Sequence, residues 1–171
     1  TVENAGLEAR GESACVSIAY GAEVNTSEEY LRVDSGSFYS ELGDTIRVTG
    51  GRMNVQSGTF IKDASLAGGI AQSGAGNSAI YVSGGILTVN GTSASPVLFR
   101  LNGSGIYGIN VEEPSGNVTS AVVSNADFLF MGASGEAGSY NCGIRAAGGS
   151  VNTEKVKFTY SGDGSNNYGI Y

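Results

Sequence analysis

The sequence predicts an all-β solenoid, a chain wound into stacked coils, and two observations carry this prediction. The first is a short phrase built on isoleucine that recurs along the 171 residues: Ile46-Arg47-Val48, Ile80-Tyr81-Val82, Ile109-Asn110-Val111, Ile144-Arg145-Ala146 and Gly169-Ile170-Tyr171. These isoleucines stand 34, 29, 35 and 26 residues apart, and Ile18 stands 28 residues before the first of them. Recurrence with a period of roughly 20 to 50 residues is typical of repeat proteins, in which each unit packs on its neighbours. We therefore expect these isoleucines, Ile18 included, to stack in one inner row.

The second observation is that each repeat holds three short stretches with the composition of β-strands. The isoleucine phrase is the first stretch. A glycine-rich break and a second apolar stretch follow it, and residues 48–55 align with residues 82–89 over this part. The third stretches are Phe60-Ile61, residues 97–101, Phe128-Leu129-Phe130 and residues 156–160. β-branched and aromatic residues bounded by Gly, Ser and Asn predict strands, and no helical period competes with them.

The chain divides into two parts. Residues 1–44 hold 9 of the 16 Asp and Glu residues, and we expect them to form an acidic, atypical N-terminal cap together with the first coil. Residues 45–171 form four repeat units and open a fifth, so the C-terminal coil is predicted to be open. The free N–H and C=O groups of an uncovered coil can pair with another chain. The candidates for such end-to-end strand pairing are Tyr168, Gly169, Ile170 and Tyr171.

Three phrases support a more specific resemblance. Tyr107-Gly108-Ile109-Asn110-Val111, Asn141-Cys142-Gly143-Ile144 and Asn167-Tyr168-Gly169-Ile170 are similar to the N-x-G-I-x-V phrase of right-handed parallel β-helices. This group includes pectate-lyase-like proteins, autotransporter passengers, surface adhesins and phage tailspikes. The resemblance covers about residues 45–171 and implies a right-handed parallel β-helix of about five coils, but a fold of this kind does not fix a function.

Composition excludes several classes of function. The net charge is −7 and no basic cluster occurs, so we expect no nucleic-acid partner, because phosphate backbones require concentrated Lys and Arg. No apolar run approaches the roughly 18 to 20 residues that span a bilayer, so no membrane span is predicted. Charged residues make up only 15% of the chain, and Ser, Thr, Asn and Gly replace them. Such a polar, weakly charged composition favours an extracellular or cell-surface location.

The sequence also argues against an enzyme. It contains no His, which removes His-based acid–base catalysis, Ser-His triads and the usual His-rich metal sites. A glycosidase needs only two carboxylates about 5 to 10 Å apart. The aspartates, however, are scattered over different loops: Asp34, Asp44, Asp63, Asp127 and Asp163. We therefore predict no catalytic residue, no cofactor and no metal.

The two cysteines are candidates for a covalent link between chains. In a coil that rises about 4.8 Å per turn, Cys15 and Cys142 would stand roughly 15 to 20 Å apart. A disulfide requires Cα atoms within about 7 Å, so an intrachain bridge is not expected in a β-helix. Two alternatives remain: two buried free thiols, or a bridge from Cys142 of one copy to Cys15 of the next.

These observations predict a non-enzymatic extracellular β-solenoid with a structural or adhesive role. It would be either a self-assembling subunit of a surface filament, stacked head to tail, or a segment of a larger adhesin. One alternative is a carbohydrate-binding or carbohydrate-degrading β-helix module of the tailspike kind, with tyrosines as stacking platforms. Its candidates are Tyr20, Tyr39, Tyr81, Tyr107 and Tyr140. Another alternative is a pilin-like sandwich closed by a bridge between Cys15 and Cys142.

Overall fold

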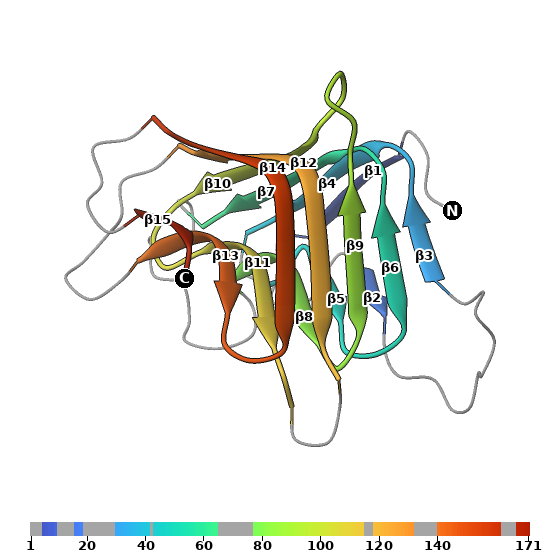
Figure 1. Ribbon diagram of the computed structural model, residues 1–171. Coiled ribbons are helices and arrows are strands. Elements are labelled where there is room, and N and C mark those ends of the chain that lie inside the picture. Colours follow the sequence, from blue (N-terminus) through green and yellow to red (C-terminus); the bar gives the residue numbers. More distant parts are fainter. Residues whose placement is uncertain are drawn as a thin grey trace.

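The protein is a parallel β-solenoid. The computed structural model describes residues 5–9, 16–18, 30–41, 43–64, 77–114, 118–131, 140–161 and 167–171, and all regular structure within them is β-strand (Figure 1). Every strand pair among these residues is parallel. The coil makes about four turns, slightly fewer than the five predicted.

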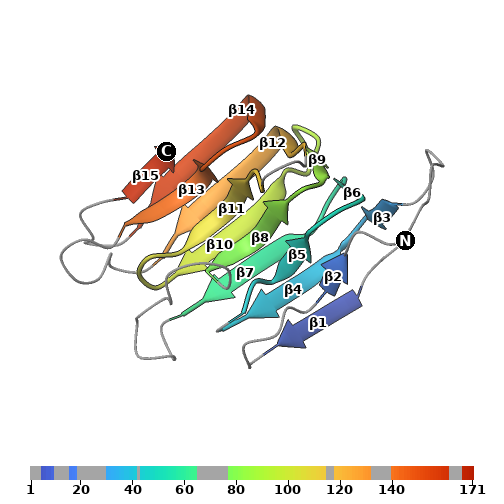
Figure 2. The same cartoon turned by 90° about the horizontal axis from the view of Figure 1, so that it is seen from below.

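One side of the coil is a six-stranded sheet, here called the isoleucine sheet, in the order β15-β13-β11-β8-β5-β2. It contains the isoleucine phrases predicted as first strands. Its strands are β2 (Val16–Ile18), β5 (Ile46–Val48), β8 (Ser78–Ser83), β11 (Tyr107–Glu112), β13 (Asn141–Ala146) and β15 (Asn167–Ile170). Figure 2 shows these strands side by side, with β2 and β15 at opposite ends of the stack.

The other nine strands form one bent sheet with two faces. The first, here called the valine face, contains β3 (Tyr30–Val33), β6 (Arg52–Val55), β9 (Ile86–Asn90) and the first halves of β12 (Ser120–Phe130) and β14 (Ser150–Tyr160). The second, here called the phenylalanine face, contains β1 (Ala5–Ala9), β4 (Gly36–Ser40), β7 (Thr59–Asp63), β10 (Val97–Asn102) and the second halves of β12 and β14.

β12 and β14 differ from the prediction of three separate strands in each unit. Each is a single strand of 11 residues that continues from the valine face onto the phenylalanine face. The bend lies at Asn125 and Lys155, whose φ angles of 48° and 53° are positive. A left-handed residue turns the chain sharply without a loop. In the preceding coil residues 91–96 separate β9 from β10 instead.

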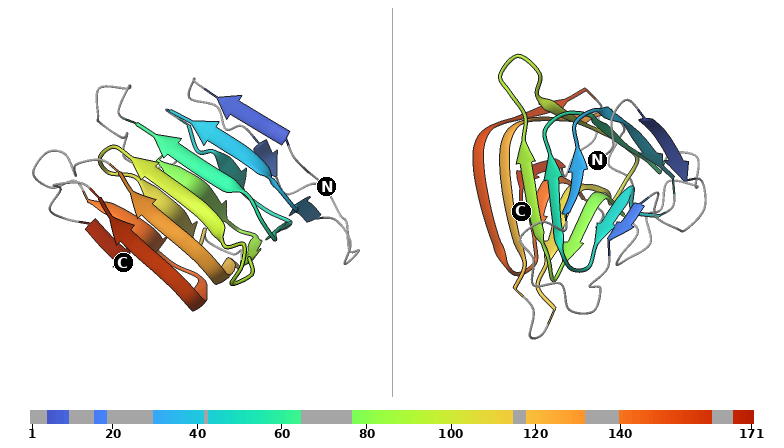
Figure 3. Two further views of the ribbon diagram at one scale, coloured as in Figure 1. Left: turned by 90° about the horizontal axis from the view of Figure 1, so that it is seen from above. Right: turned by 90° about the vertical axis from the view of Figure 1, so that its right-hand side faces the viewer.

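The coil is right-handed, as the resemblance implied. Seen from the N-terminal end (Figure 3, right), the chain rises along the valine face, crosses the phenylalanine face and returns along the isoleucine sheet. It turns clockwise while it moves away from the viewer.

The core contains stacked rows of identical side chains. On the phenylalanine face, Phe38, Phe60, Phe99, Phe128 and Phe158 stack with successive ring-centroid distances of 5.0, 5.3, 4.4 and 5.2 Å. The first four rings are almost completely buried. Aromatic pairs at such distances contribute about 0.5 to 1.5 kcal/mol beyond the burial of their area.

The isoleucine row is confirmed from Ile46 onward and wrong at its first member. Ile46, Ile80, Ile109, Ile144 and Ile170 stand beside one another in register. The residue beside Ile46 in β2 is Val16, and Ile18 stands beside Val48 instead. A shift of two residues keeps a side chain on the same side of a strand, so alternation alone could not detect this error.

The glycine that precedes isoleucine in the later coils has a packing reason. A Cβ added to Gly108 would lie 2.5 Å from Cε1 of Phe128, and one added to Gly143 would lie 2.2 Å from Cε1 of Phe158. Real Cβ atoms do not come so close to another atom. The glycines therefore leave space for phenylalanine rings that reach across the core from the opposite face.

Buried charges fix the corner between β4 and β5. Lys62 is 1% exposed, and its Nζ donates hydrogen bonds of 2.7 Å to the carbonyl oxygens of Glu41 and of Gly43. Asp44 is fully buried and accepts hydrogen bonds from the backbone N–H of Ser78 at 3.0 Å and from Arg47. These hydrogen bonds and the ion pair offset the free-energy cost of removing the charged groups of Lys62 and Asp44 from water.

Candidate functional site

The four residues predicted to pair end to end lie at the end of the stack. β15 pairs with β13 and is the outermost strand of the isoleucine sheet in the described part of the chain. Tyr168 stands beside Cys142, and Ile170 stands beside Ile144. Tyr171 follows directly, and its N–H donates to the carbonyl oxygen of Ile144 at 3.0 Å. Pairing of this strand with another chain stays a prediction.

The inward-facing side chains of the core rows are more exposed to solvent in this last coil. Ile144 is fully buried, whereas Ile170, the next member of its row, is 52% exposed. Phe128 is 1% exposed, whereas Phe158, which stacks on it, is only partly buried. Side chains that belong to the core therefore face solvent at this end of the described structure.

β14, which pairs only with β12 among the described strands, adds a long backbone edge to this surface. The N–H of Ser161 donates to the carbonyl oxygen of Phe130 at 2.9 Å, so odd-numbered residues in the second half of β14 face β12. In a parallel strand alternate residues direct their N–H and C=O groups to opposite sides. The backbone groups of Phe158 and Tyr160 therefore point away from β12, toward the open side. We call β14 and β15 together the open edge.

The outer surface of the isoleucine sheet carries a second feature, a polar row. The middle residues of the isoleucine phrases stand in register, in the order Arg47, Tyr81, Asn110 and Arg145. The Nη2 of Arg47 lies 2.9 Å from Oδ2 of the buried Asp44. Its guanidinium carbon lies 5.5 Å from the centre of the Tyr81 ring, which is a cation–π distance.

Glu112 is hydrogen-bonded to other members of this row. It accepts hydrogen bonds from Nη1 of Arg145 at 2.9 Å and from the hydroxyl of Tyr81 at 3.0 Å. Nη1 of Arg145 also donates to Oδ1 of Asn110 at 3.0 Å. Burial raises the pKa of Tyr81, and the negative charge of Glu112 raises it further. These contacts hold the side chains of the polar row in fixed positions.

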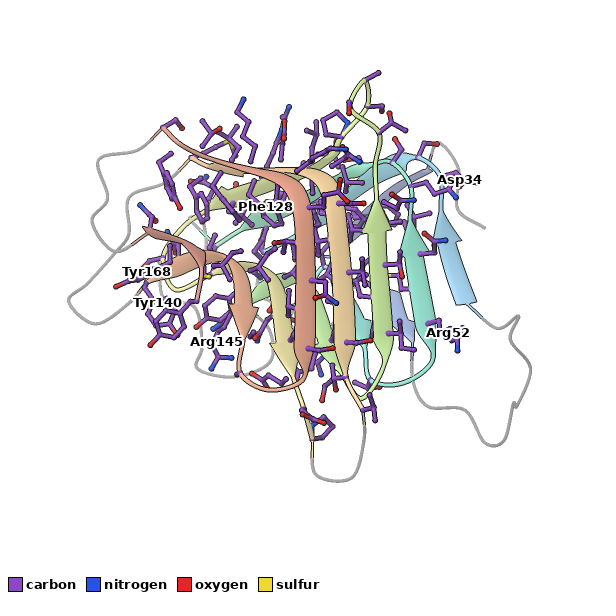
Figure 4. All side chains as sticks on the ribbon, in the orientation of Figure 1. Asp34, Arg52, Phe128, Tyr140, Arg145 and Tyr168 are labelled. Carbon is purple, nitrogen blue, oxygen red and sulfur yellow. The ribbon has the colours of Figure 1, made fainter. Side chains whose placement is uncertain are left out.

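Four tyrosines continue the outer surface of this sheet toward the open edge. We call Tyr107, Tyr140, Tyr168 and Tyr171 the tyrosine cluster. The centroid distances are 5.9 Å from Tyr107 to Tyr140, 5.6 Å from Tyr140 to Tyr168 and 4.8 Å from Tyr140 to Tyr171. Figure 4 shows Tyr140 and Tyr168 close to Arg145 at this end, with Asp34 and Arg52 at the other.

Arg145 connects the polar row to the tyrosine cluster. Its guanidinium carbon lies 5.4 Å from the centre of the Tyr107 ring. Burial and the neighbouring Tyr140 raise the pKa of Tyr107 to about 12, so its hydroxyl keeps its proton at neutral pH. Tyr168 and Tyr171 are the open members of the cluster, with 41% and 60% of their surface exposed.

The structure gathers only part of the predicted set of stacking tyrosines. Tyr107 and Tyr140 belong to the tyrosine cluster, and Tyr81 lies nearby in the polar row but is 9% exposed. Tyr39 lies on the phenylalanine face, where its hydroxyl donates to Glu41 at 3.1 Å. Tyr20 lies outside the described residues.

The position of Cys142 favours the buried-thiol alternative. Cys142 is a free cysteine with no exposed surface, and its thiol donates to the carbonyl oxygen of Ile144 at 2.9 Å. Burial raises the pKa of this thiol to about 12. The other predicted linkage residue, Cys15, lies outside the described residues, so a link between copies stays a prediction.

The acidic groups do not form a centre in the part of the chain that the structure describes. Within those residues no group of three or more His, Cys, Asp and Glu side chains is arranged to hold a metal ion. Most of the acidic front, including Glu3, Glu12, Glu23, Glu28 and Glu29, and also Asp163, lies outside them. A helix with the length and hydropathy of a transmembrane segment does not occur among the described residues either.

Sequence reasoning missed the charged members of the outer surface. Arg47, Glu112 and Arg145 were not singled out, and Tyr168 and Tyr171 were considered only for strand pairing. A signal was available, because the residue between two inward-facing positions of a strand must face outward. That rule applied to each isoleucine phrase selects Arg47, Tyr81, Asn110 and Arg145. It does not select Glu112 or reveal its bonds to other coils.

No protein-family profile, curated protein or solved structure matches this chain. The fold assignment therefore rests on the strands and their register, and the resemblance to the pectate-lyase-like and adhesin-like group has only this architecture in its support.

Proposed function

We propose that this chain is a non-enzymatic structural or adhesive element that works outside the cell. Its solenoid would be lengthened at the open edge by parallel strand addition. The added strands would come from a second copy, which gives a surface filament, or from another part of a larger surface adhesin.

The observation that carries the proposal is the open edge. Its backbone N–H and C=O groups are directed to form a further ladder, and Phe158 and Ile170 already stand in the core rows that a further coil would continue. An exposed strand edge of this length is a template for pairing. Covering it buries both apolar side chains and satisfies the free backbone groups.

The distribution of charge favours a second copy as the added unit. Residues 1–44 contain nine acidic and two basic residues, a net charge of −7. Residues 140–171 contain Arg145, Lys155 and Lys157 against Glu154 and Asp163, a net charge of +1. Opposite charge at the two ends directs a head-to-tail encounter and disfavours the meeting of two acidic ends. A head-to-tail contact that does not close on itself gives a filament.

Two further features agree with a mechanical rather than a catalytic role. Continuous ladders and the stacked phenylalanines resist local unfolding, because each coil is held on both sides. The sequence lacks His, so the common acid–base and metal chemistry is not available.

Light scattering coupled to size-exclusion chromatography, together with electron microscopy, tests the proposal. We expect the mass of the wild-type chain to rise with concentration and fibres to form. Ile170→Lys places a charge on the open edge and should keep the chain monomeric. The matched control is Val122→Lys. Val122 is 43% exposed on β12, which is already paired on both sides with β9 and β14, so this variant should assemble like the wild type.

A chain that stays monomeric at every concentration would contradict assembly between copies and leave only extension within a larger protein. A non-reducing gel of the same samples tests the covalent link. Because Cys142 is buried, we expect no ladder that disappears on reduction.

A further inference from the structure

We propose that the tyrosine cluster and Arg145 bind a linear, uncharged carbohydrate that lies along the solenoid axis. This inference adds a binding activity to the structural role, and it does not depend on assembly at the open edge. The rings of the cluster lie on the outer surface of the isoleucine sheet; Tyr168 also belongs to β15, whose backbone edge is where strand addition would take place.

The spacing of the rings suits a polymer of sugar rings. Neighbouring centroids in the cluster are 4.8 to 5.9 Å apart, and the rings come from or adjoin three successive strands, β11, β13 and β15. Strands repeat at about 4.8 Å along the axis. This rise per strand is comparable to the length of one hexose unit, so a sugar chain along the axis would pass the rings of successive strands, which are tilted by 37° to 88° to one another.

The chemistry of the cluster matches the two kinds of surface that a sugar presents. A tyrosine ring offers an apolar face to the C–H groups of a pyranose ring, and its hydroxyl offers a polar edge. Beside these rings, Arg145 and Glu112 supply a planar donor and a carboxylate acceptor, with 24% and 35% of their side chains exposed. In sites lined by aromatic rings, a small number of polar groups in fixed positions set the orientation of a small ligand.

The balance of charge selects the class of sugar. Two arginines of this outer surface are each paired with a carboxylate, Arg47 with Asp44 and Arg145 with Glu112, both at 2.9 Å. Among the described residues of this surface, no arginine is left unpaired to attract an acidic polysaccharide. The contacts of Arg145 with Glu112 and Asn110 also hold it in place before a ligand arrives, which lowers the entropy cost of binding.

The test is a titration of the chain with neutral hexasaccharides of the cello, malto and xylo series, followed by calorimetry and by NMR. We expect at least one series to bind. Tyr168→Ala and Tyr171→Ala should each weaken that binding more than tenfold, because each substitution removes the stacking contact between a tyrosine ring and the sugar. Binding should change little with salt, since the ligand is uncharged.

The matched control is Tyr160→Ala. Tyr160 is 43% exposed, close to the 41% of Tyr168, and it also lies in the last coil, but on the phenylalanine face. This variant should bind the sugar like the wild type. Circular dichroism of each variant checks that the fold is kept, and Tyr171, the most exposed ring of the cluster, gives the variant with least effect on packing.

Three results would overturn the inference: no series binds, Tyr160→Ala weakens binding as much as Tyr168→Ala, or only acidic sugars bind and salt abolishes the complex. If Tyr168→Ala lowers the mass of the assembly while sugar binding is unchanged, the cluster is an interface between copies and the inference is also wrong. Ile170→Lys separates the two proposals, because it should abolish assembly and keep the affinity for sugar.

Discussion

At the scale of single residues, the recurring Gly-Ile pair is explained by packing across the core. The isoleucines form an inward-facing row from Ile46 onward. Gly108 is close to Phe128 because the isoleucine sheet and the phenylalanine face lie opposite each other in the folded coil. A larger side chain at this glycine would need the space that the phenylalanine ring occupies.

A substitution at Gly108 measures this constraint. Gly108→Ala should lower the free energy of unfolding by about 1 to 3 kcal/mol, the usual cost of overpacking, because the new Cβ would overlap a ring held between two others. Gly6→Ala is the control, since nothing lies within 4 Å of its added Cβ. Urea unfolding followed by circular dichroism gives both values. Equal effects of the two substitutions would show that the packing at Gly108 is not tight.

The thiol of Cys142 makes stability depend on pH in a defined direction. Its pKa is about 12 in the folded chain, above the value of about 8.5 in an unfolded one. Above pH 8.5 the unfolded chain loses this proton first, so the stabilising contribution is complete below that pH and is lost as the pH rises toward 12. The free energy of unfolding of the wild type should therefore fall more steeply between about pH 9 and 11 than that of Cys142→Ala. Parallel slopes would contradict this.

At the scale of elements, the strands were largely predictable and the corners were not. The three runs of each unit correspond to strands of the isoleucine sheet, the valine face and the phenylalanine face. The fusion of the last two runs into β12 and β14 was missed, because it depends on positive φ at Asn125 and Lys155. Asparagine is a known candidate for that conformation, but lysine gives no such signal.

Lys155 tests the strain at this corner. Lys155→Gly should raise the free energy of unfolding by up to about 1 kcal/mol, because glycine adopts φ of 53° without steric cost. The exposed ion pair with Glu154 that is lost contributes little. Lys157→Gly, in the same strand with an ordinary φ, should lower it by about 1 kcal/mol. Thermal unfolding of the two variants compares them, and destabilisation by both would mean that Lys155 is not strained.

The phenylalanine row predicts a gradient of stability along the stack. Phe99→Ala should cost about 3 to 5 kcal/mol, since this ring is fully buried between Phe60 and Phe128. Phe158→Ala should cost clearly less, because its ring is partly exposed beside the open edge. Denaturant unfolding of the two variants tests the order. A larger loss for Phe158 would indicate that the last coil is covered in solution.

At the scale of the whole molecule, the repeat was enough to predict a parallel coil, but not what surrounds that coil. The number of turns was slightly overestimated. The places of β14 and β15 follow from the sequence, because both strands continue rows that earlier coils define. The outer surface of the isoleucine sheet does not, because the contacts among Arg145, Glu112 and Tyr81 join residues about 30 positions apart in the chain. Such pairs meet only once the register between coils is known.

The most direct test of the central claim is amide hydrogen exchange of β14, measured by NMR in dilute and in concentrated solution. The N–H groups of Phe158 and Tyr160 point to the open side, whereas that of Ser161 donates to Phe130 within the coil. If a second copy adds its strands at the open edge, exchange at Phe158 and Tyr160 will slow as concentration rises, and exchange at Ser161 will not change. Rapid exchange at Phe158 and Tyr160 at every concentration would contradict assembly through this edge.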